Sequence, residues 1–149
     1  MAVSSSLKKL VRDRARGLCE YCHASEDWQF VAHTMDHILP QSAGGPDTSE
    51  NLALACVNCN TRRQARTESV VDGNPVPFFN PRTDNWNDHF AWSHDALDII
   101  ALTDVGRGTL DVLDLNGNRH GDANKLRRIR AEDRRLDRHP PQGDRIYDA

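Results

Sequence analysis

The sequence predicts a small α+β fold with a zinc-stapled ββα core, that is, a core held together by one zinc ion bound between two pairs of cysteines. Two Cys-x-x-Cys motifs lie far apart in the sequence, with 33 residues between Cys22 and Cys56. The segment between and just after them has the pattern of a strand, a turn-rich loop, a second strand and a helix. An amphipathic helix precedes this core, and a small β-sheet and a charged helix follow it.

The length of 149 residues predicts a single domain with a modest core. We divide it into a basic N-terminal helix over residues 1–18, the zinc-stapled core over 19–68, and an extension of the same domain over 69–149. The last ~10 residues are rich in proline and charge and are expected to be flexible.

The composition excludes a membrane protein and favours a cytoplasmic location. No apolar run approaches the ~20 residues that cross a bilayer, and the first residues lack the apolar core of a signal peptide. Thiols stay reduced in the cytoplasm, where paired cysteines usually bind metal.

The net charge of −3 argues against a nucleic-acid-binding protein, but the charges are unevenly distributed. No Lys or Arg occurs from Gly17 to Thr61, whereas basic residues flank this acidic stretch on both sides. Such an arrangement could hold a cation against a polyanion, and ordinary solvated charge is an equal alternative.

The N-terminal half gives clear element boundaries. Ser4 to Ser6 can cap a helix that Gly17 ends. Residues 28–39 favour a strand or hairpin, 40–50 a loop, 51–56 a short strand, and 57–67 a helix of about three turns.

The C-terminal half is less distinctive. Residues 71–81 have the composition of a loop. Strands are expected at 89–92, 97–103 and 109–115, with "DVGRG" as the hairpin turn between the last two, and a charged helix at 122–138.

The four cysteines are the strongest chemical signal. The "CEYCH" run alone fits a c-type haem site, a redox pair or half of a zinc site. A redox role would not need the second pair, and haem would leave that pair unexplained, so we predict no haem. Four thiolates from Cys19, Cys22, Cys56 and Cys59 match a structural, tetrahedral zinc site.

A set of residues between and after the cysteines resembles the HNH endonuclease family with its ββα-metal fold. The matching run is Cys19-x-x-Cys22, Asp36-His37-Ile38-x-Pro40, Gly44-Gly45, Asn51-Leu52 and Cys56-x-x-Cys59-Asn60. The downstream runs "FFNPRTDNWNDHFAW", "IIALTDVGRGT" and "HPP" are similar to a common bacterial branch of the family.

The resemblance implies a metal-dependent endonuclease in which His37 is the general base that activates water. It implies that Asp36 and Asn60 hold one catalytic Mg²⁺ or Mn²⁺, since both offer hard oxygen donors. It further implies that Asn51 orients His37 through a hydrogen bond. The helix that carries Asn60 also carries Arg62, Arg63 and Arg66, which we expect to contact phosphate.

One residue departs from the family pattern, and one pair of residues imposes a geometric condition. The last motif residue is Asn60 where the family often has His, which favours Mg²⁺ or Mn²⁺ over softer metals. Asp36 and His37 are neighbours and would point to opposite faces of a regular strand. Both can serve one phosphate only if the strand twists or ends there.

The resemblance implies DNA as the substrate, with RNA as an alternative. Target sequence, nicking versus double-strand cleavage, and a homodimer remain open. The competing hypothesis is a non-catalytic zinc module with four cysteine ligands that binds nucleic acid or protein, which needs neither the Asp-His pair nor a second metal.

Overall fold

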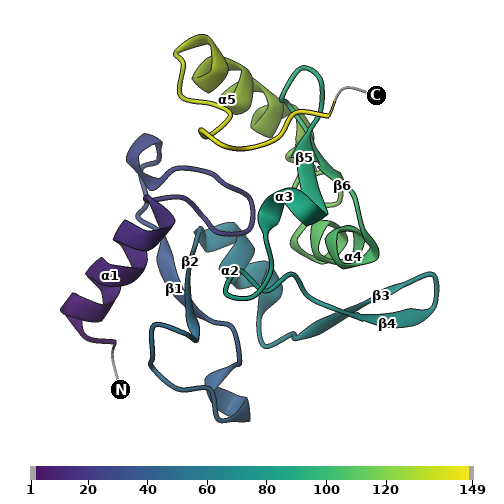
Figure 1. Cartoon of the computed structure of the whole chain (residues 1–149). Helices are drawn as coiled ribbons and strands as arrows, with labels where there is room; N and C mark the ends of the chain where they lie inside the picture. Colours follow the sequence, from purple (N-terminus) through teal and green to yellow (C-terminus); the bar gives the residue numbers. More distant parts are fainter. Residues whose placement is uncertain (1–2, 148–149) are drawn as a thin grey trace. The chain divides into compact units, whose positions relative to one another are not determined.

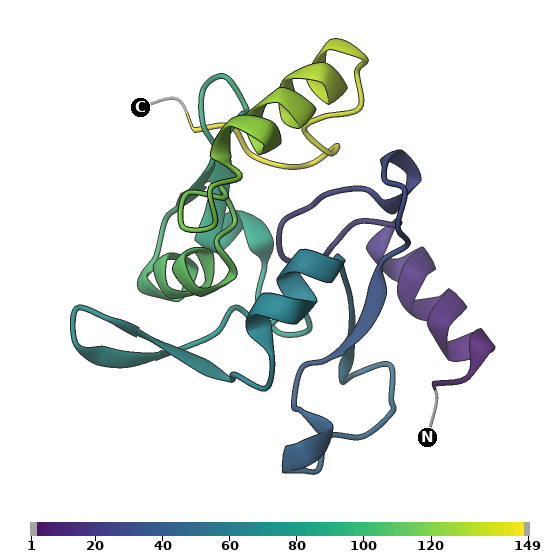
Figure 2. The same ribbon diagram turned by 180° about the vertical axis from the view of Figure 1, so that it is seen from behind.

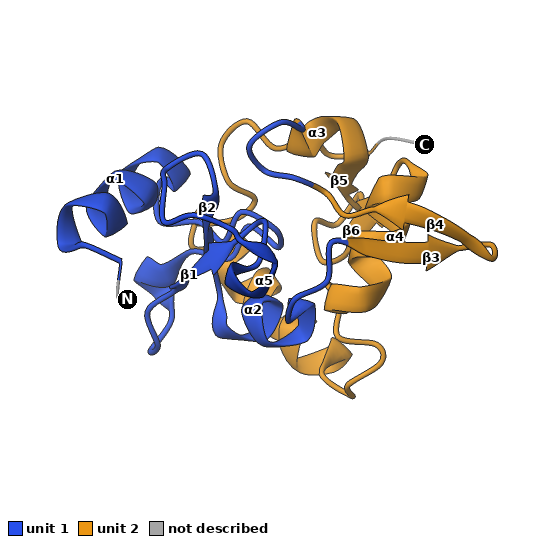
Figure 3. Cartoon of the chain, turned by 90° about the horizontal axis from the view of Figure 1, so that it is seen from below, with its two compact units in different colours: residues 1–67, 80–84 blue, residues 68–79, 85–149 orange. Residues whose placement is uncertain are grey.

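The computed structural model describes residues 3–147, which form two compact units (Figure 3). Unit 1 contains the chain up to Thr67 together with Asn80–Asp84. Unit 2 contains Glu68–Phe79 and the chain from Asn85 onward. The predicted α+β class is confirmed, because helices combine with small antiparallel two-stranded sheets in the described range.

Unit 1 is built on a β-hairpin with a helix on each side (Figure 1). Strand β1 (Thr34–His37) pairs antiparallel with β2 (Leu52–Ala55), and His37 lies opposite Leu52. Helix α2 (Val57–Arg63) follows β2 directly and contacts β1. This strand, strand, helix order is the predicted ββα core.

Helix α1 (Ser5–Ala15) covers the hairpin through its apolar face. The Ser4 hydroxyl accepts a hydrogen bond from the Leu7 amide and so caps the helix, which ends at Arg16 in the left-handed region. Its buried residues Val11 and Ala15 form one apolar core with Leu52 and Leu54 of β2. Helix α1 is therefore part of the core of unit 1.

Two short 3₁₀ turns complete unit 1, η1 (Glu26–Trp28) and η2 (Gln41–Ala43). The strand predicted over 28–39 is wrong in its first half, because only 34–37 pair with a neighbour and Phe30 is fully exposed. Helix α2 is also shorter than predicted. It stops at Arg63 because Gln64 takes a positive φ of 54°.

In the part of the chain that the structure describes, unit 2 contains two hairpins and three helices (Figure 2). Its elements are β3 (Glu68–Val71), β4 (Asn74–Pro77), α3 (Trp86–His89), β5 (Phe90–Trp92), β6 (Ile99–Ala101), α4 (Asp104–Leu113) and α5 (Ala123–Arg135). The predicted strands near 89–92 and 97–103 and the charged helix are confirmed.

The loop predicted over 71–81 is wrong, because β3 and β4 form a hairpin there. Its turn is Asp72-Gly73, with φ values of 51° and 80°. An Asp-Gly pair that follows β-branched residues, here Val70 and Val71, is a strong signal for a two-residue hairpin turn. Pro75 and Pro77 mask that signal, since proline normally argues against a strand.

The strand predicted over 109–115 is also wrong, because α4 runs through both "DVGRG" and most of "TLDVLDL". The Thr103 hydroxyl caps the helix by accepting from the Gly106 amide. A Cβ on Gly108 would lie 1.9 Å from Ser69 Oγ of β3. Gly108 therefore lies in a helix that packs closely on β3, and not in the turn that "DVGRG" predicts.

The predicted flexible terminus lies partly outside the described residues, which end at Tyr147. Within them, Arg145 and Tyr147 hydrogen bond through their backbones to Trp92 of β5. None of the described helices combines the length and the apolar character that a membrane span needs.

Candidate active site

The four cysteines converge at one point in unit 1. Their sulfur atoms all lie within 4.8 Å of one another, as the ligands of a tetrahedral zinc ion must. The amides of Cys22 and Cys59 point at the sulfurs of Cys19 and Cys56, at 3.5 and 3.4 Å. Hydrogen bonds from the other three cysteines hold the pKa of Cys56 far below its ordinary value. Burial raises the pKa of Cys19, and hydrogen bonds from the other cysteines raise that of Cys59, so of these three thiols Cys56 is the one that favours thiolate, the form that binds zinc.

His37 ends β1 with its side chain 16% exposed. Its Nε2 atom lies 2.6 Å from Oδ1 of Asp47, in the loop that connects β1 to β2. That hydrogen bond lowers the pKa of Asp47 below its ordinary value. The imidazole is therefore accessible to solvent yet held by a carboxylate.

Asp36 is buried, with 3% of its surface exposed. Tyr21 donates its hydroxyl to Oδ2 at 2.6 Å, and Arg63 donates to both carboxylate oxygens at 2.9 and 2.8 Å. Burial raises the pKa of Asp36, and the Arg63 charge and the two donors offset part of that rise. Burial likewise raises the pKa of Tyr21, which keeps its proton and remains a donor.

Asn60 lies on the same face of α2 as Arg63, three residues earlier. Its Nδ2 donates to the Thr34 hydroxyl at 2.8 Å. Thr34 and Asp36 share one face of β1 because their positions differ by two. Asp36 and Asn60 therefore both lie at the β1–α2 interface, whereas His37, the last residue of β1, contacts the loop that follows the strand.

Asn51 does not hydrogen bond to the His37 imidazole in the structure. Its Oδ1 accepts from the Leu39 amide at 2.8 Å, and its Nδ2 donates to the carbonyls of Leu39 and Pro46, both at 3.0 Å. Asn51, at the end of the loop between β1 and β2, therefore closes it by bonding to its start at Leu39 and to its interior at Pro46.

The three arginines of α2 and the turn after it lie in different environments. Arg63 is 2% exposed and donates to Asp36 and to the His37 carbonyl, so its guanidinium supports the fold and does not face a ligand phosphate. Arg62 is half-buried, and Arg66 is exposed. Of the three guanidinium groups, those of Arg62 and Arg66 are therefore the ones with surface open to solvent.

Sequence reasoning missed two residues of this site, Asp47 and Tyr21. Asp47 lies ten residues after His37 in a stretch of turn formers, and only the folded loop brings the two together. Tyr21 lies inside the first Cys-x-x-Cys motif, and that motif indicates a role only for its two cysteines. No local spacing points to either contact.

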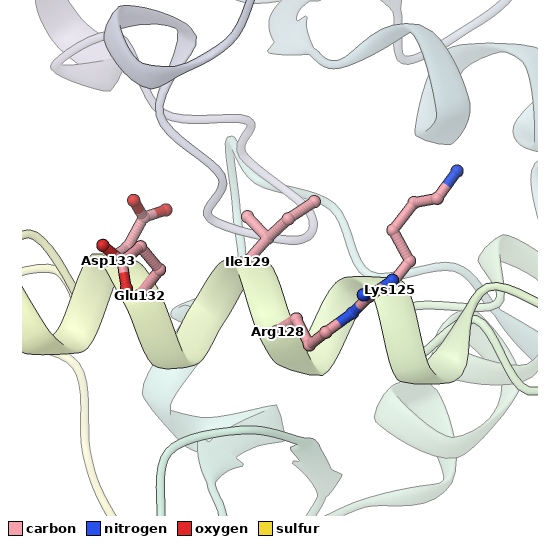
Figure 4. A pocket seen from close by; sticks show the side chains of 5 residues that line it. All are labelled: Lys125, Arg128, Ile129, Glu132 and Asp133. Carbon is pink, nitrogen blue, oxygen red and sulfur yellow. The ribbon is translucent and has the colours of Figure 1, made fainter.

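A surface pocket lies along α5 of unit 2. Its lining residues Lys125, Arg128, Ile129, Glu132 and Asp133 all come from that helix (Figure 4). Two cations and two carboxylates give the pocket no preferred sign of charge. It therefore indicates no ligand class.

A comparison with models of known protein families finds a match for the segment that contains His37. Residues 19–66 match the family model of the HNH endonuclease. They form an HNH endonuclease domain. The match spans about a third of the chain and includes both cysteine pairs, Asp36, His37, Asn51 and Asn60. A search of curated proteins found no match.

The HNH family implies nuclease activity in general terms, acting on nucleic acid. The match begins at Cys19 and ends at Arg66, so it lies entirely within unit 1. Helix α1 and the whole of unit 2 lie outside the HNH domain.

Proposed function

We propose that the protein is a metal-dependent endonuclease that hydrolyses phosphodiester bonds, with DNA as the substrate and His37 as the general base. The observation that carries the proposal is the position of His37. It is a solvent-accessible imidazole within the HNH domain, at the end of β1, held by a carboxylate. A neutral imidazole can accept a proton from water.

The donor set at the β1–α2 interface fits a divalent ion in its chemistry. Asp36 offers a carboxylate and Asn60 an amide oxygen, both hard donors that suit Mg²⁺ or Mn²⁺. Only Nδ2 of Asn60 has a hydrogen-bond partner among the described residues, which leaves Oδ1 for an ion. When bound, the ion would neutralise charge on the scissile phosphate and stabilise the leaving 3′ oxygen.

The remaining residues would support this chemistry. Arg62 and Arg66 would contact the phosphate backbone next to the cleaved bond, which is a sequence-independent interaction. One structural zinc ion at the four cysteines would fix the two ends of the HNH domain. We also infer a cytoplasmic location, because four free thiols persist where the environment is reducing.

The test is a plasmid nicking assay with Mg²⁺ or Mn²⁺. His37→Ala should lower the cleavage rate by roughly 10²–10⁴-fold, the usual contribution of a general base. His94→Ala, an exposed histidine of unit 2, is the matched control and should cleave at the wild-type rate. Full activity of His37→Ala would refute the mechanism.

One observation favours the alternative, a non-catalytic four-cysteine zinc module that binds nucleic acid or protein. The carboxylate of Asp36 already accepts hydrogen bonds from Tyr21 and Arg63, so a divalent ion would have to share it. Titration calorimetry of the zinc-loaded protein with Mg²⁺ or Mn²⁺ distinguishes the two functions. Heat of binding that disappears in Asp36→Asn supports the nuclease, and no binding by an inert wild type supports the module.

A further inference from the structure

The contact between His37 and Asp47 has the geometry of a strong hydrogen bond. The distance from Nε2 to Oδ1 is 2.6 Å, within the range of charge-assisted pairs. The side chains are 16% and 31% exposed, so bulk water competes with the contact only in part. The two residues come from the end of β1 and from the following loop, so the contact depends on how that loop folds.

The loop holds Asp47 in place from two directions. Gln41 donates its Nε2 to the same carboxylate oxygen at 3.3 Å. Asn51 donates to the carbonyl of Pro46, the residue before Asp47, and also bonds to Leu39 at the start of the loop. The carboxylate is therefore positioned by contacts of its own and is not a mobile surface group that happens to meet His37.

This contact decides which imidazole nitrogen carries the proton. The hydrogen bond from His37 lowers the pKa of Asp47, so its carboxylate is ionised at neutral pH. An ionised carboxylate accepts hydrogen bonds but cannot donate them. Nε2 of His37 must therefore be the donor, and in a neutral imidazole the lone pair then lies on Nδ1.

We propose that Asp47 is a positioning residue that orients the His37 ring and keeps its proton on Nε2, so that Nδ1 is the atom that accepts the proton of the attacking water. The catalytic half of this statement rests on the proposed nuclease function. A proton moves from water to Nδ1 as the water oxygen bonds to phosphorus. The bond from phosphorus to the 3′ oxygen breaks, and that oxygen takes up a proton from solvent. Asn51 then acts on His37 indirectly, through the loop that carries Asp47.

The first experiment needs no cleavage. Long-range ¹H–¹⁵N correlation spectra of the full, zinc-loaded chain with ¹⁵N-labelled histidine report the tautomer of each neutral imidazole, and His37→Gln assigns the His37 signals. We expect the Nε2-protonated form in the wild type and a mixture of tautomers in Asp47→Ala. Glu50→Gln removes one negative charge from the same loop and should keep the wild-type pattern.

The second experiment measures cleavage by the same variants. Asp47→Ala should lower kcat roughly 10- to 100-fold, as loss of an orienting partner typically does, with KM close to the wild-type value. Asp47→Glu should recover part of the loss, and Glu50→Gln should match the wild type. Melting temperatures near that of the wild type show that the variants fold. If Asp47→Ala does not fold, the isosteric Asp47→Asn replaces it in both experiments.

Three results would overturn the proposal. One is a wild-type His37 with its proton on Nδ1, and another is a kcat of Asp47→Ala equal to that of Glu50→Gln. The third is loss of Mg²⁺ binding in Asp47→Ala by calorimetry, which would make Asp47 a metal ligand. A wild type that cleaves nothing but keeps the Nε2 tautomer, lost in Asp47→Ala, refutes the nuclease function and leaves the orienting contact standing.

Discussion

At the scale of single residues, the most consequential contact is the buried ion pair between Arg63 and Asp36. Arg63 donates to both oxygens of the carboxylate and to the His37 carbonyl, and it lies over the ring of Tyr21, 5.9 Å from its centroid. A buried pair of this kind adds little net stability compared with apolar side chains. Removing one partner is costly, however, because the other charge is left buried without compensation.

This predicts different outcomes for two arginines of the same segment. Arg63→Ala should lower the free energy of unfolding by about 3–5 kcal/mol, measured by urea denaturation, because Asp36 loses its partner. Arg66→Ala should leave stability unchanged, since Arg66 is exposed. If Arg66 contacts phosphate, its loss should instead lower the slope of log Kd for DNA against log salt by about one.

A double variant tests the cause of the Arg63 effect. Asp36→Asn combined with Arg63→Met removes both charges, and it should regain much of the stability that Arg63→Ala loses. If the double variant is as unstable as Arg63→Ala, the loss of stability comes from the lost packing of the Arg63 side chain and not from the uncompensated carboxylate of Asp36.

Residues of the site could be predicted from the sequence where their type and their spacing form a recognisable pattern. The four cysteines and the Asp36-His37, Asn51 and Asn60 positions follow from the sequence pattern. Their partners do not, because a hydrogen bond between side chains depends on how loops and faces meet in space. Arg63 illustrates this limit: its position on the helix suggested phosphate contact, and only the packing of α2 on β1 shows that it is buried.

At the scale of elements, the loop between β1 and β2 is the part on which His37 depends. Asn51 closes it, and Gly45 allows its close packing. A Cβ at Gly45 would lie 1.7 Å from the carbonyl oxygen of Leu39 and 2.9 Å from Nδ2 of Asn51. No rearrangement of a single side chain relieves a clash with backbone, so the loop itself would have to move.

Gly45→Ala should therefore displace the loop that carries Asp47. We expect a loss of roughly 1–3 kcal/mol in the free energy of unfolding, the usual cost of overpacking, together with slower cleavage. Ser42→Ala, at an exposed position in η2 of the same loop, is the matched control for both measurements. Wild-type stability and activity of Gly45→Ala would mean that the loop tolerates movement.

The elements themselves were predictable where local signals and packing agree. Helix α1 has its cap, its apolar face and its stop signal in sequence, and it forms as expected. Helix α4 does not, because Gly106 and Gly108 look like turn residues until the atoms that they approach are known. A Cβ on Gly106 would lie 2.4 Å from the His89 carbonyl oxygen, a contact between residues distant in sequence.

At the scale of the whole molecule, each unit has a core of its own. The four-cysteine cluster and the apolar contacts of α1 with β2 lie in unit 1. In unit 2, Trp86 packs against Phe90 and Trp92, with ring centroids 5.3 and 6.0 Å away. The third tryptophan, Trp28, is 49% exposed and belongs to unit 1. Tryptophan fluorescence of buried rings therefore reports on unit 2.

Zinc removal should accordingly unfold unit 1 and spare unit 2. We expect Cys19→Ser to lose zinc and to melt at a much lower temperature, because structural zinc contributes apparent binding energies of about 10–16 kcal/mol in small domains. Circular dichroism should report the loss, while the emission maximum of the buried tryptophans stays near its wild-type position.

His23→Asn is the control for this change, since it alters the same short motif without removing a thiolate and asparagine tolerates the positive φ of 62° at this position. It should keep its zinc, measured by metal analysis. An emission maximum that shifts to the red together with the circular dichroism of Cys19→Ser would contradict separate unfolding of the two units.

Unit 1 is not one continuous piece of the chain, and this affects how the protein can be cut. The chain leaves unit 1 after Thr67 and returns at Asn80–Asp84 (Figure 3). There Arg82 forms an ion pair with Glu20, whose other oxygen accepts from the Leu54 amide. During synthesis on the ribosome, unit 1 cannot be complete until residue 84 has emerged. A fragment that stops at residue 66, where the HNH match ends, would lack this last contact, so a truncated form that keeps unit 1 intact should extend at least to Asp84.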